Sequence, residues 1–337
     1  MRVDRRAVHR RCSIVLPHLR RSGNAPSADR LPYSAARVLG AYARREKEID
    51  RLILACFVLG LSTRKVGEAL LTILGERVSP ATVSRVAHTL DQAVAAFHRR
   101  PLQDRYRVLL LDGVVLARKT GAGAHRRPVL VALGLTPQGK KEIIDFRLAD
   151  GESAVAWEAF LVDLYRRGLK GDQLRLVAVD GGTGLLQALP LVYPLVPIQR
   201  CWAHKTRNLT DRVRRADREA IKCDLRRISH ARTRVLARSA ARRFAERWRA
   251  TYPKVVASLR QDLEELLAFF CFDQEKWRLM TRTTNAIERR FREVRRRTRP
   301  MGVFSDRTSM DRILFAVFTY ENRKEGTGPL FLLTQNS

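Results

Sequence analysis

Two apolar runs that each end in Asp-Gly constrain the fold more than any other feature of the chain. Residues 108–111 lead into Asp112-Gly113, and residues 176–179 lead into Asp180-Gly181. Short runs of Leu and Val predict buried β-strands, and a run that stops at Asp-Gly places its carboxylate at the edge of a sheet. Ligand sites collect at such edges. Each Asp-Gly pair taken alone is also typical of an ordinary turn.

The hydrophobic pattern between residues 105 and 204 predicts three strands, a helix, a strand, a helix and a last strand. The expected strands span residues 108–116, 128–135, 141–148, 174–179 and 196–199, and the expected helices span residues 154–167 and 185–191. This is the order of a ribonuclease-H-like α/β core. Such a core has its first acid on strand one and its second at the end of strand four, which matches Asp112 and Asp180.

The segments before and after this core have helical spacing. Ser79 and Pro80 predict the N-cap and first residue of a helix. Together with a preceding short helix and a turn at Gly75, this helix forms a helix-turn-helix pattern. Recognition of DNA ends and mere packing of a helical hairpin both remain open for it. The residues here that we expect to contact DNA are Arg64, Lys65, Thr82, Ser84 and Arg85.

The predicted fold class is therefore α/β, with a ribonuclease-H-like core that is interrupted by an α-helical insertion and preceded by an all-α, helix-turn-helix-like domain. The expected parts are a basic flexible arm at 1–45, a helical DNA-end-binding domain at 46–104, the first part of the core at 105–204, a helical insertion at 205–281, the last part of the core at 282–325 and a tail at 326–337.

The charge of the chain predicts a polyanionic partner. The formal net charge is +31 and the isoelectric point about 11.2, and Arg supplies 54 of the 65 basic residues. Arg binds phosphates and guanine edges through two parallel hydrogen bonds. The 5 cysteines are scattered, which favours a reducing cytoplasm. The longest apolar run, residues 52–61, is half of the roughly 20 residues that a membrane helix needs.

Glu288 is the candidate third acid, at the start of an Arg-rich helix. One interpretation makes it the acid of a capping box behind Asn285. The other groups it with Asp112 and Asp180, and clusters made only of carboxylates suit hard cations such as Mg²⁺ or Mn²⁺. The Arg residues that we expect to face DNA phosphates, or else only solvent, are Arg289, Arg292, Arg295 and Arg296.

Residues 283–299, with Gln199-Arg200-Cys201-Trp202-Ala203-His204 upstream, resemble the Mutator-type transposases of bacterial insertion sequences. Segments 60–64, 78–84 and 302–304 extend the resemblance, which covers about residues 46–320. The resemblance implies that Asp112, Asp180 and Glu288 hold a divalent metal in a ribonuclease-H-like fold. It also implies that the protein cuts and rejoins the terminal inverted repeats of its element.

The Cys201-Trp202-Ala203-His204 segment has several possible roles. The resemblance implies a family signature near the active site, where His204 positions the scissile phosphate or assists proton transfer and Cys201 packs in the core. Cys201 and His204 could instead bind zinc, completed by Cys223 and His230, although neither spacing is a common zinc pattern. Trp202 either stacks on an extruded base or belongs to the core.

These features predict a transposase in the bacterial cytoplasm, associated with the nucleoid. We expect Mg²⁺ or Mn²⁺ as cofactor and double-stranded DNA as partner, both as terminal inverted repeats and as target. A dimer or larger assembly is expected, because each DNA end requires an active site, and no membrane partner is expected. Two alternatives remain open: a non-catalytic repressor descended from a transposase, and a structure-specific ribonuclease-H-like nuclease.

Overall fold

The computed structural model describes residues 49–50, 52–53, 56, 63–74, 78–120, 123–298 and 307–327, and only the backbone of 63, 64, 72–74, 117–120 and 123–126. The predicted arm at 1–45, the motifs at 60–62 and 302–304, Gly75 and most of the predicted tail lie outside these ranges. Contacts divide the chain into units 1–49 and 50–337, and the fold described below belongs to the second.

The fold is mixed α/β and is built on one five-stranded sheet in the order β3-β2-β1-β4-β5. The strands are β1 (Val108–Thr120), β2 (Gly123–Leu135), β3 (Lys141–Leu148), β4 (Leu176–Val179) and β5 (Ile198–Arg200). The first three pair antiparallel, whereas β4 runs parallel to β1 and β5 runs parallel to β4. The predicted order of strands and helices is confirmed.

Asp112 does not end its strand, which corrects one expectation. The strand β1 continues to Thr120, and every residue from Val108 onward pairs with β2. The Asp-Gly pair does not form a turn here because the β2 hairpin partner supplies an extended ladder beyond it. The neighbour on the other side, β4, stops at Val179, opposite Leu111. Asp112 therefore lies at the point where the parallel half of the sheet ends.

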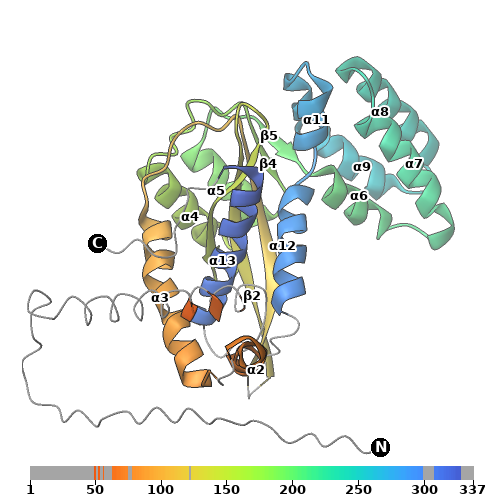
Figure 1. The fold of residues 1–337 in the computed structure, drawn as a ribbon. Helices are drawn as coiled ribbons and strands as arrows, with labels where there is room; N and C mark the ends of the chain where they lie inside the picture. Colours follow the sequence, from red (N-terminus) through yellow and green to blue (C-terminus); the bar gives the residue numbers. More distant parts are fainter. Residues whose placement is uncertain are drawn as a thin grey trace, which may run out of the picture. The chain divides into compact units, whose positions relative to one another are not determined.

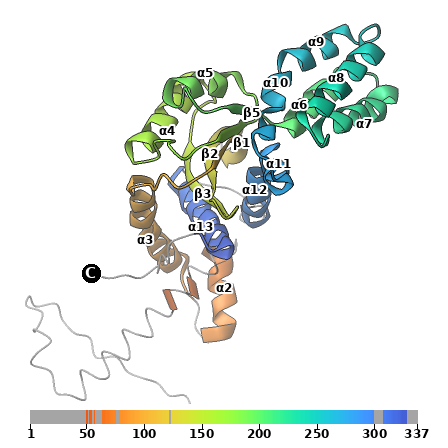
Figure 2. The same cartoon turned by 90° about the horizontal axis from the view of Figure 1, so that it is seen from above.

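Helices cover both faces of the sheet, as Figure 2 shows. On one face lie α4 (Ala154–Arg166) and α5 (Thr183–Val192), whose Trp157, Phe160 and Leu185 share a core with Leu109 and Leu111 of β1. On the other face lie α12 (Asn285–Thr298), α13 (Arg307–Glu325) and α3 (Pro80–Arg99). Aromatic rings close that second core, with Phe146 of β3 against Phe97 and Phe318.

The chain between β5 and α12 is helical wherever it has regular structure (Figure 1). Its elements are α6 (Trp202–Thr210), η2 (Arg215–Asp217), α7 (Arg218–Ser229), α8 (Arg234–Trp248), α9 (Pro253–Gln261), α10 (Leu263–Leu266), η3 (Ala268–Cys271) and α11 (Glu275–Thr281). Their mutual packing buries Phe244, Trp248 and Leu259. This segment joins β5 to α12, so its two ends meet at the edge of the sheet that carries Asp112 and Asp180.

The N-terminal helices are α2 (Thr63–Leu74) and α3. Ser79 caps α3 as predicted, because the backbone N–H of Thr82 donates to Ser79 Oγ at 3.1 Å and Pro80 is the first helical residue. The buried side of α3 packs on α13, where Arg312 donates to Asp91 and to His88. Among the helices that the structure describes, none has the length and apolar character needed to cross a membrane.

Candidate active site

Asp112 is a buried carboxylate with one unsatisfied oxygen. Its side chain is only 3% exposed, and its Oδ2 has no hydrogen-bond partner among the described residues. Alternation along β1 directs Asp112 away from Leu111 and thus toward the face covered by α12. A buried carboxylate normally costs several kcal/mol unless it is paired, so this group indicates a site where a ligand supplies the missing partner.

Asp180 follows β4 directly, one step beyond the pairing of Leu111 with Val179. One carboxylate oxygen closes the turn, because the backbone N–H of Gly182 donates to Asp180 Oδ1 at 2.9 Å. Gly181 has φ of +99°, a conformation that favours glycine. The turn role uses only one of the two carboxylate oxygens of Asp180.

Glu288 reaches the same place from the first turn of α12, which packs against β1. Its Oε1 lies 3.7 Å from Nε2 of His204. The predicted cap by Asn285 is wrong: Asn285 is itself helical and its buried Oδ1 accepts no hydrogen bond from the described residues.

Electrostatic interactions couple Asp112 with Asp180, Glu288 and His204. Burial, and then the charge of Asp180, raise the pKa of Asp112 to about 7, and Glu288 adds to the effect. The adjacent Cys201 thiol, followed by the charges of Asp112 and Asp180, raises the pKa of His204 to about 9. His204 is therefore a cation at neutral pH, placed among three carboxylates.

Cys201 and Trp202 belong to the core. Cys201 is fully buried, and its Sγ accepts from the backbone N–H of Thr284 at 3.3 Å, which joins the start of α6 to the start of α12. The Trp202 indole N–H donates to the carbonyl of Leu266 at 2.7 Å. Base stacking on Trp202 is therefore not supported. The zinc alternative is not supported either, because Cys223 is exposed and no metal cluster forms among the described His, Cys, Asp and Glu residues.

Within the described ranges, Asp112, Asp180 and Glu288 are likewise not close enough together to form a ready metal site. Their chemistry nevertheless fits a hard divalent cation. All three are carboxylates, Asp112 has an orphaned buried oxygen, and no described Lys or Arg forms an ion pair with any of them. In a chain with 65 basic residues, that lack of pairing leaves charge for a cation to neutralise.

The Arg residues of α12 divide into two sets. Arg290 is buried and pairs with Glu321 and Glu325, while buried Arg297 pairs with Glu293. The predicted DNA-facing set is exposed, and only Arg296 in it has an ion pair, with Glu293 at 3.2 Å. That set is Arg289, Arg292, Arg295 and Arg296. These exposed cations thus lie on the helix whose first turn contains Glu288.

The predicted DNA-contacting residues of α2 and α3 lie apart from the carboxylates in sequence and on other elements. Lys65 and Arg85 are exposed, and Ser84 is half-buried. Thr82 Oγ1 lies 3.0 Å from Ser79 Oγ, so this hydroxyl takes part in the cap of α3. Arg64 belongs to α2, but its side chain is outside the described set.

A cavity of about 580 Å³ opens beside the site, between α6, α7 and the start of α12. No Asp or Glu lines it, whereas apolar walls come from Leu279 and Met280. Its basic lining residues are Lys141, Lys222, Arg226, Arg282 and Arg289. Sequence reasoning missed all of these except Arg289, because they are scattered over 149 positions that only the fold brings together.

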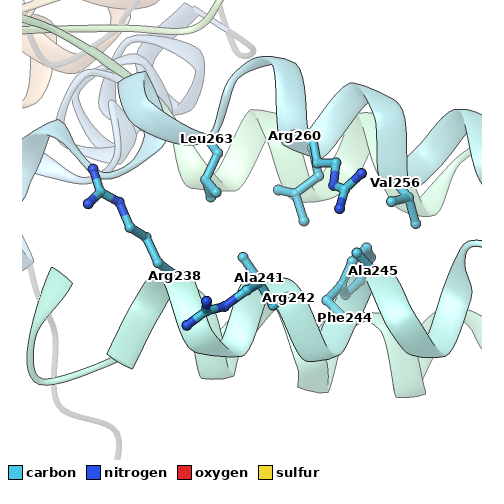
Figure 3. A pocket seen from close by; sticks show the side chains of 9 residues that line it. Arg238, Ala241, Arg242, Phe244, Ala245, Val256, Arg260 and Leu263 are labelled. Carbon is cyan, nitrogen blue, oxygen red and sulfur yellow. The ribbon is translucent and has the colours of Figure 1, made fainter. Parts of the chain in front are cut away.

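A second, smaller cavity lies between α8 and α9 (Figure 3). Its volume is about 50 Å³, and it is lined by side chains such as Ala241, Phe244 and Val256, with Arg238 and Arg260 at its border. A space this small holds one or two water molecules at most. It is a packing gap of the helical segment, and it contains none of the site carboxylates.

Comparison with known proteins places these features in a family context. The model of a family described as "Transposase, Mutator family" matches residues 28–325. The transposase for insertion sequence element IS905 of Lactococcus lactis is 33% identical over 86% of this chain and 72% of its own length. That for IST2 of Acidithiobacillus ferrooxidans is 39% identical over 68% and 78%. That for IS406 of Burkholderia multivorans is 30% identical over 96% and 81%.

Proposed function

The chain belongs to the Mutator family of transposases, and on that premise we propose that it binds the terminal inverted repeats of an insertion sequence and cleaves and joins DNA strands there. The observation that carries the proposal is the group of unpaired carboxylates around Asp112. Asp180 and Glu288 both act on the pKa of Asp112, and none of the three has a basic partner other than His204 in the described structure.

We propose a ribonuclease-H-like core for this site. Three antiparallel strands followed by two parallel ones, with α4 and α5 as the crossovers, support it. The helices from α6 to α11 are then an insertion into this core, at about residues 205–281, and α12 resumes it. The helices α2 and α3 are proposed as the helix-turn-helix-like part that recognises the repeat.

Asp112, Asp180 and Glu288 would hold Mg²⁺ or Mn²⁺. When bound, the metal would supply Lewis acidity that lowers the pKa of water and stabilises charge on the phosphate. The buried Asp112 excludes bulk water from one side of the site. The protonated His204, 3.7 Å from Glu288, can neutralise charge on the scissile phosphate or deliver a proton to the leaving 3′ oxygen. No covalent protein intermediate is required.

The exposed Arg face of α12 and the basic cavity would hold the DNA. Arg292 and Arg295 lie about one and two turns beyond Glu288 on the same helix, so DNA along α12 would bring its backbone past the carboxylates. The cavity next to Asn285 and Arg289 has the positive charge and the volume for a strand that leaves the duplex near the cut. Each DNA end needs one active site, so we propose that at least two copies assemble on paired ends.

The test is a nicking assay on labelled DNA that carries the terminal repeat of the element, with Mg²⁺ or Mn²⁺. Wild type is compared with Glu288→Gln at equal bound fraction. Glu158→Gln is the matched control, because Glu158 is an exposed acid on α4 without a described partner. We expect cleavage by wild type and control, and binding without cleavage by Glu288→Gln.

Three other outcomes would each overturn part of the proposal. Equal cleavage by Glu288→Gln removes Glu288 from the site. Repeat-specific binding without cleavage by wild type indicates a transposase-derived repressor. Cleavage that follows junction or hybrid structure and ignores the repeat indicates a structure-specific nuclease. Affinity alone does not separate these cases, because all of them predict a basic surface with salt-dependent binding.

A further inference from the structure

Glu152 is an acid that the sequence pattern did not single out. It lies in the turn between β3 and α4, directly before Ser153, whose hydroxyl caps α4 by accepting from the Ala156 N–H at 3.2 Å. Its carboxylate has no hydrogen bond and no ion pair with any residue that the structure describes. The side chain is exposed, so the missing salt bridge does not by itself distinguish Glu152, whereas its contacts with two glycines do.

The glycine after Asp112 makes room for this carboxylate. A Cβ atom on Gly113 would lie 2.6 Å from Cδ of Glu152 and 2.7 Å and 2.9 Å from its two oxygens. No real Cβ tolerates such distances, so a side chain at position 113 would displace the Glu152 carboxylate. The carboxyl group of Glu152 thus rests directly on the backbone of β1 next to Asp112.

The glycine-rich turn after Asp180 makes room for the backbone of Glu152. A Cβ atom on Gly184 would lie 2.3 Å from the carbonyl oxygen of Glu152 and 2.8 Å from the carbonyl carbon of Ser153. Both Asp-Gly segments therefore have a glycine where they meet Glu152. This contact also explains Asp180-Gly181-Gly182-Thr183-Gly184, which lacks the lysine and the spacing of a nucleotide-binding loop.

The two glutamates approach the sheet edge from opposite faces. Gly113 alternates with Asp112 along β1 and shares the face of Leu111, which packs on α4 and α5. Glu152 therefore comes from the α4 side, whereas Glu288 comes from α12 on the other side. Asp180 is close to both groups: burial and then the charge of Asp180 raise the pKa of Glu152, and Asp180 acts likewise on Asp112.

We propose that Glu152 is a fourth carboxylate at this edge of the sheet and supplies, together with Asp180, an oxygen ligand to a divalent cation. This rests on the proposed metal-dependent function. The independent sign of a ligand is Asp112 itself, which is 3% exposed and has an oxygen without any partner in the described structure. Hard cations such as Mg²⁺ and Mn²⁺ prefer carboxylate oxygens, and a fourth one increases the charge and the number of ligands at this edge.

The experiment measures binding of Mn²⁺ to the full-length protein without DNA, by calorimetry and by the shift in melting temperature. The variants are Glu152→Gln, Asp112→Asn and the control Glu158→Gln on α4. We expect Glu152→Gln and Asp112→Asn to weaken Mn²⁺ binding at least about tenfold, with no change for Glu158→Gln. Without metal, Glu152→Gln should melt no lower than wild type, because it removes a repelling charge.

Wild-type Mn²⁺ affinity in Glu152→Gln, with weakened binding in Asp112→Asn, overturns the role of Glu152 alone. Unchanged binding in both variants, or no binding by wild type, overturns the proposed metal site as well. A lower melting temperature of Glu152→Gln without metal, at unchanged affinity, assigns Glu152 to the start of α4 instead. If Glu152→Gln does not fold, Gly113→Ala replaces it, because its Cβ pushes the intact Glu152 carboxylate away. That variant must then lose Mn²⁺ affinity, or the proposal fails.

Discussion

Asp112 and Asp145 are equally buried aspartates on strands of the same sheet, at 3% and 2% exposure, yet their surroundings are opposite. Asp145 on β3 is fully paired. Its Oδ1 lies 2.6 Å from Nδ1 of His98 and accepts the Phe146 N–H at 2.8 Å, and its Oδ2 accepts from Arg167. Asp112 has an oxygen with no described partner and faces two further acids.

The difference separates a structural acid from a functional one. A buried charge persists at low cost only when hydrogen bonds and an opposite charge compensate it. Asp145 meets that condition within the protein and ties α3 and α4 to the sheet. Asp112 meets it only in part, because burial and the charges of Asp180 and Glu288 outweigh the opposing effects of His204 and Thr284 on its pKa. The free energy that remains uncompensated becomes available for a bound cation. Burial alone thus says nothing about function, whereas burial without a partner does.

The largest expected effect is on catalysis. Asp112→Asn should lower the rate of cleavage of repeat DNA by roughly 10⁴-fold, because losing a metal ligand removes several kcal/mol of transition-state stabilisation. Single-turnover nicking in Mg²⁺ measures it, with Asp150→Asn as control, since Asp150 is an exposed acid that pairs with Arg127. A folded Asp112→Asn variant that cleaves at the wild-type rate would remove the functional half of the comparison.

Asp145→Ala should have its effect on stability instead. It leaves Arg167, which is 10% exposed, with only its ion pair to Asp163, and breaking a buried ion pair costs about 3–5 kcal/mol. Urea unfolding of the metal-free protein measures the change. The fraction that remains folded should cleave DNA at the wild-type rate. Loss of catalysis at unchanged stability would mean that the two aspartates had been assigned the wrong way round.

The contrast also shows how far sequence reasoning reached. The hydrophobic pattern predicted β3 at its observed bounds and α4 to within one residue, because periodicity reports local packing directly. It failed at Asp112, where Asp-Gly resembles a turn, since the decisive hydrogen bonds come from β2. It also missed Glu152, a single acid in a turn. The only signals in the sequence were Gly113 and Gly184. Their contacts with Glu152 become visible only when β1 and α5 are placed in the fold.

The side-chain partners of the charged residues on α12 could not be predicted from the sequence either. Asn285 and Glu288 have the spacing of a capping box, yet Glu288 contacts His204, which follows β5. The helical spacing left Arg290 and Arg297 out of the predicted DNA-facing set, and both are buried. Their ion pairs with Glu325 and Glu293 were not predicted. Contacts between residues far apart in the chain decide these cases, and a single sequence does not contain that information.

The third prediction concerns pH. The pKa of Asp112 is raised to about 7 in the folded protein, so between about pH 4 and pH 7 the native state binds a proton that the unfolded state releases. Wild type therefore becomes less stable as the pH rises through this window. The Asp112→Asn variant has no such group and keeps its stability. In EDTA, the variant should exceed wild type by on the order of 4 kcal/mol at pH 8 and by little at pH 4.

Urea unfolding at several pH values measures this difference, and the control is Asp145→Asn. That variant should be less stable than wild type at pH 8, because it weakens the pairing with Arg167. A stability gain for Asp112→Asn that is constant from pH 4 to pH 8 would show that its carboxylate is not held protonated by its surroundings.

The smallest effect is expected for substitutions on α12. This helix also has an unpaired and a paired residue of the same kind, here two arginines. Exposed Arg292 has no described partner, whereas buried Arg297 donates to Glu293 at 2.7 Å. Arg292→Ala should therefore leave stability within about 0.5 kcal/mol and reduce the slope of log K against log salt by about 0.9, the value for one phosphate contact. Filter binding to repeat DNA between about 50 and 200 mM salt measures the slope, with Arg166→Ala on the opposite face of the sheet as control. An unchanged slope would show that the exposed Arg residues of α12 face solvent and do not contact phosphates. The unpaired arginines would then have no ligand, in contrast to the ligand proposed for Asp112.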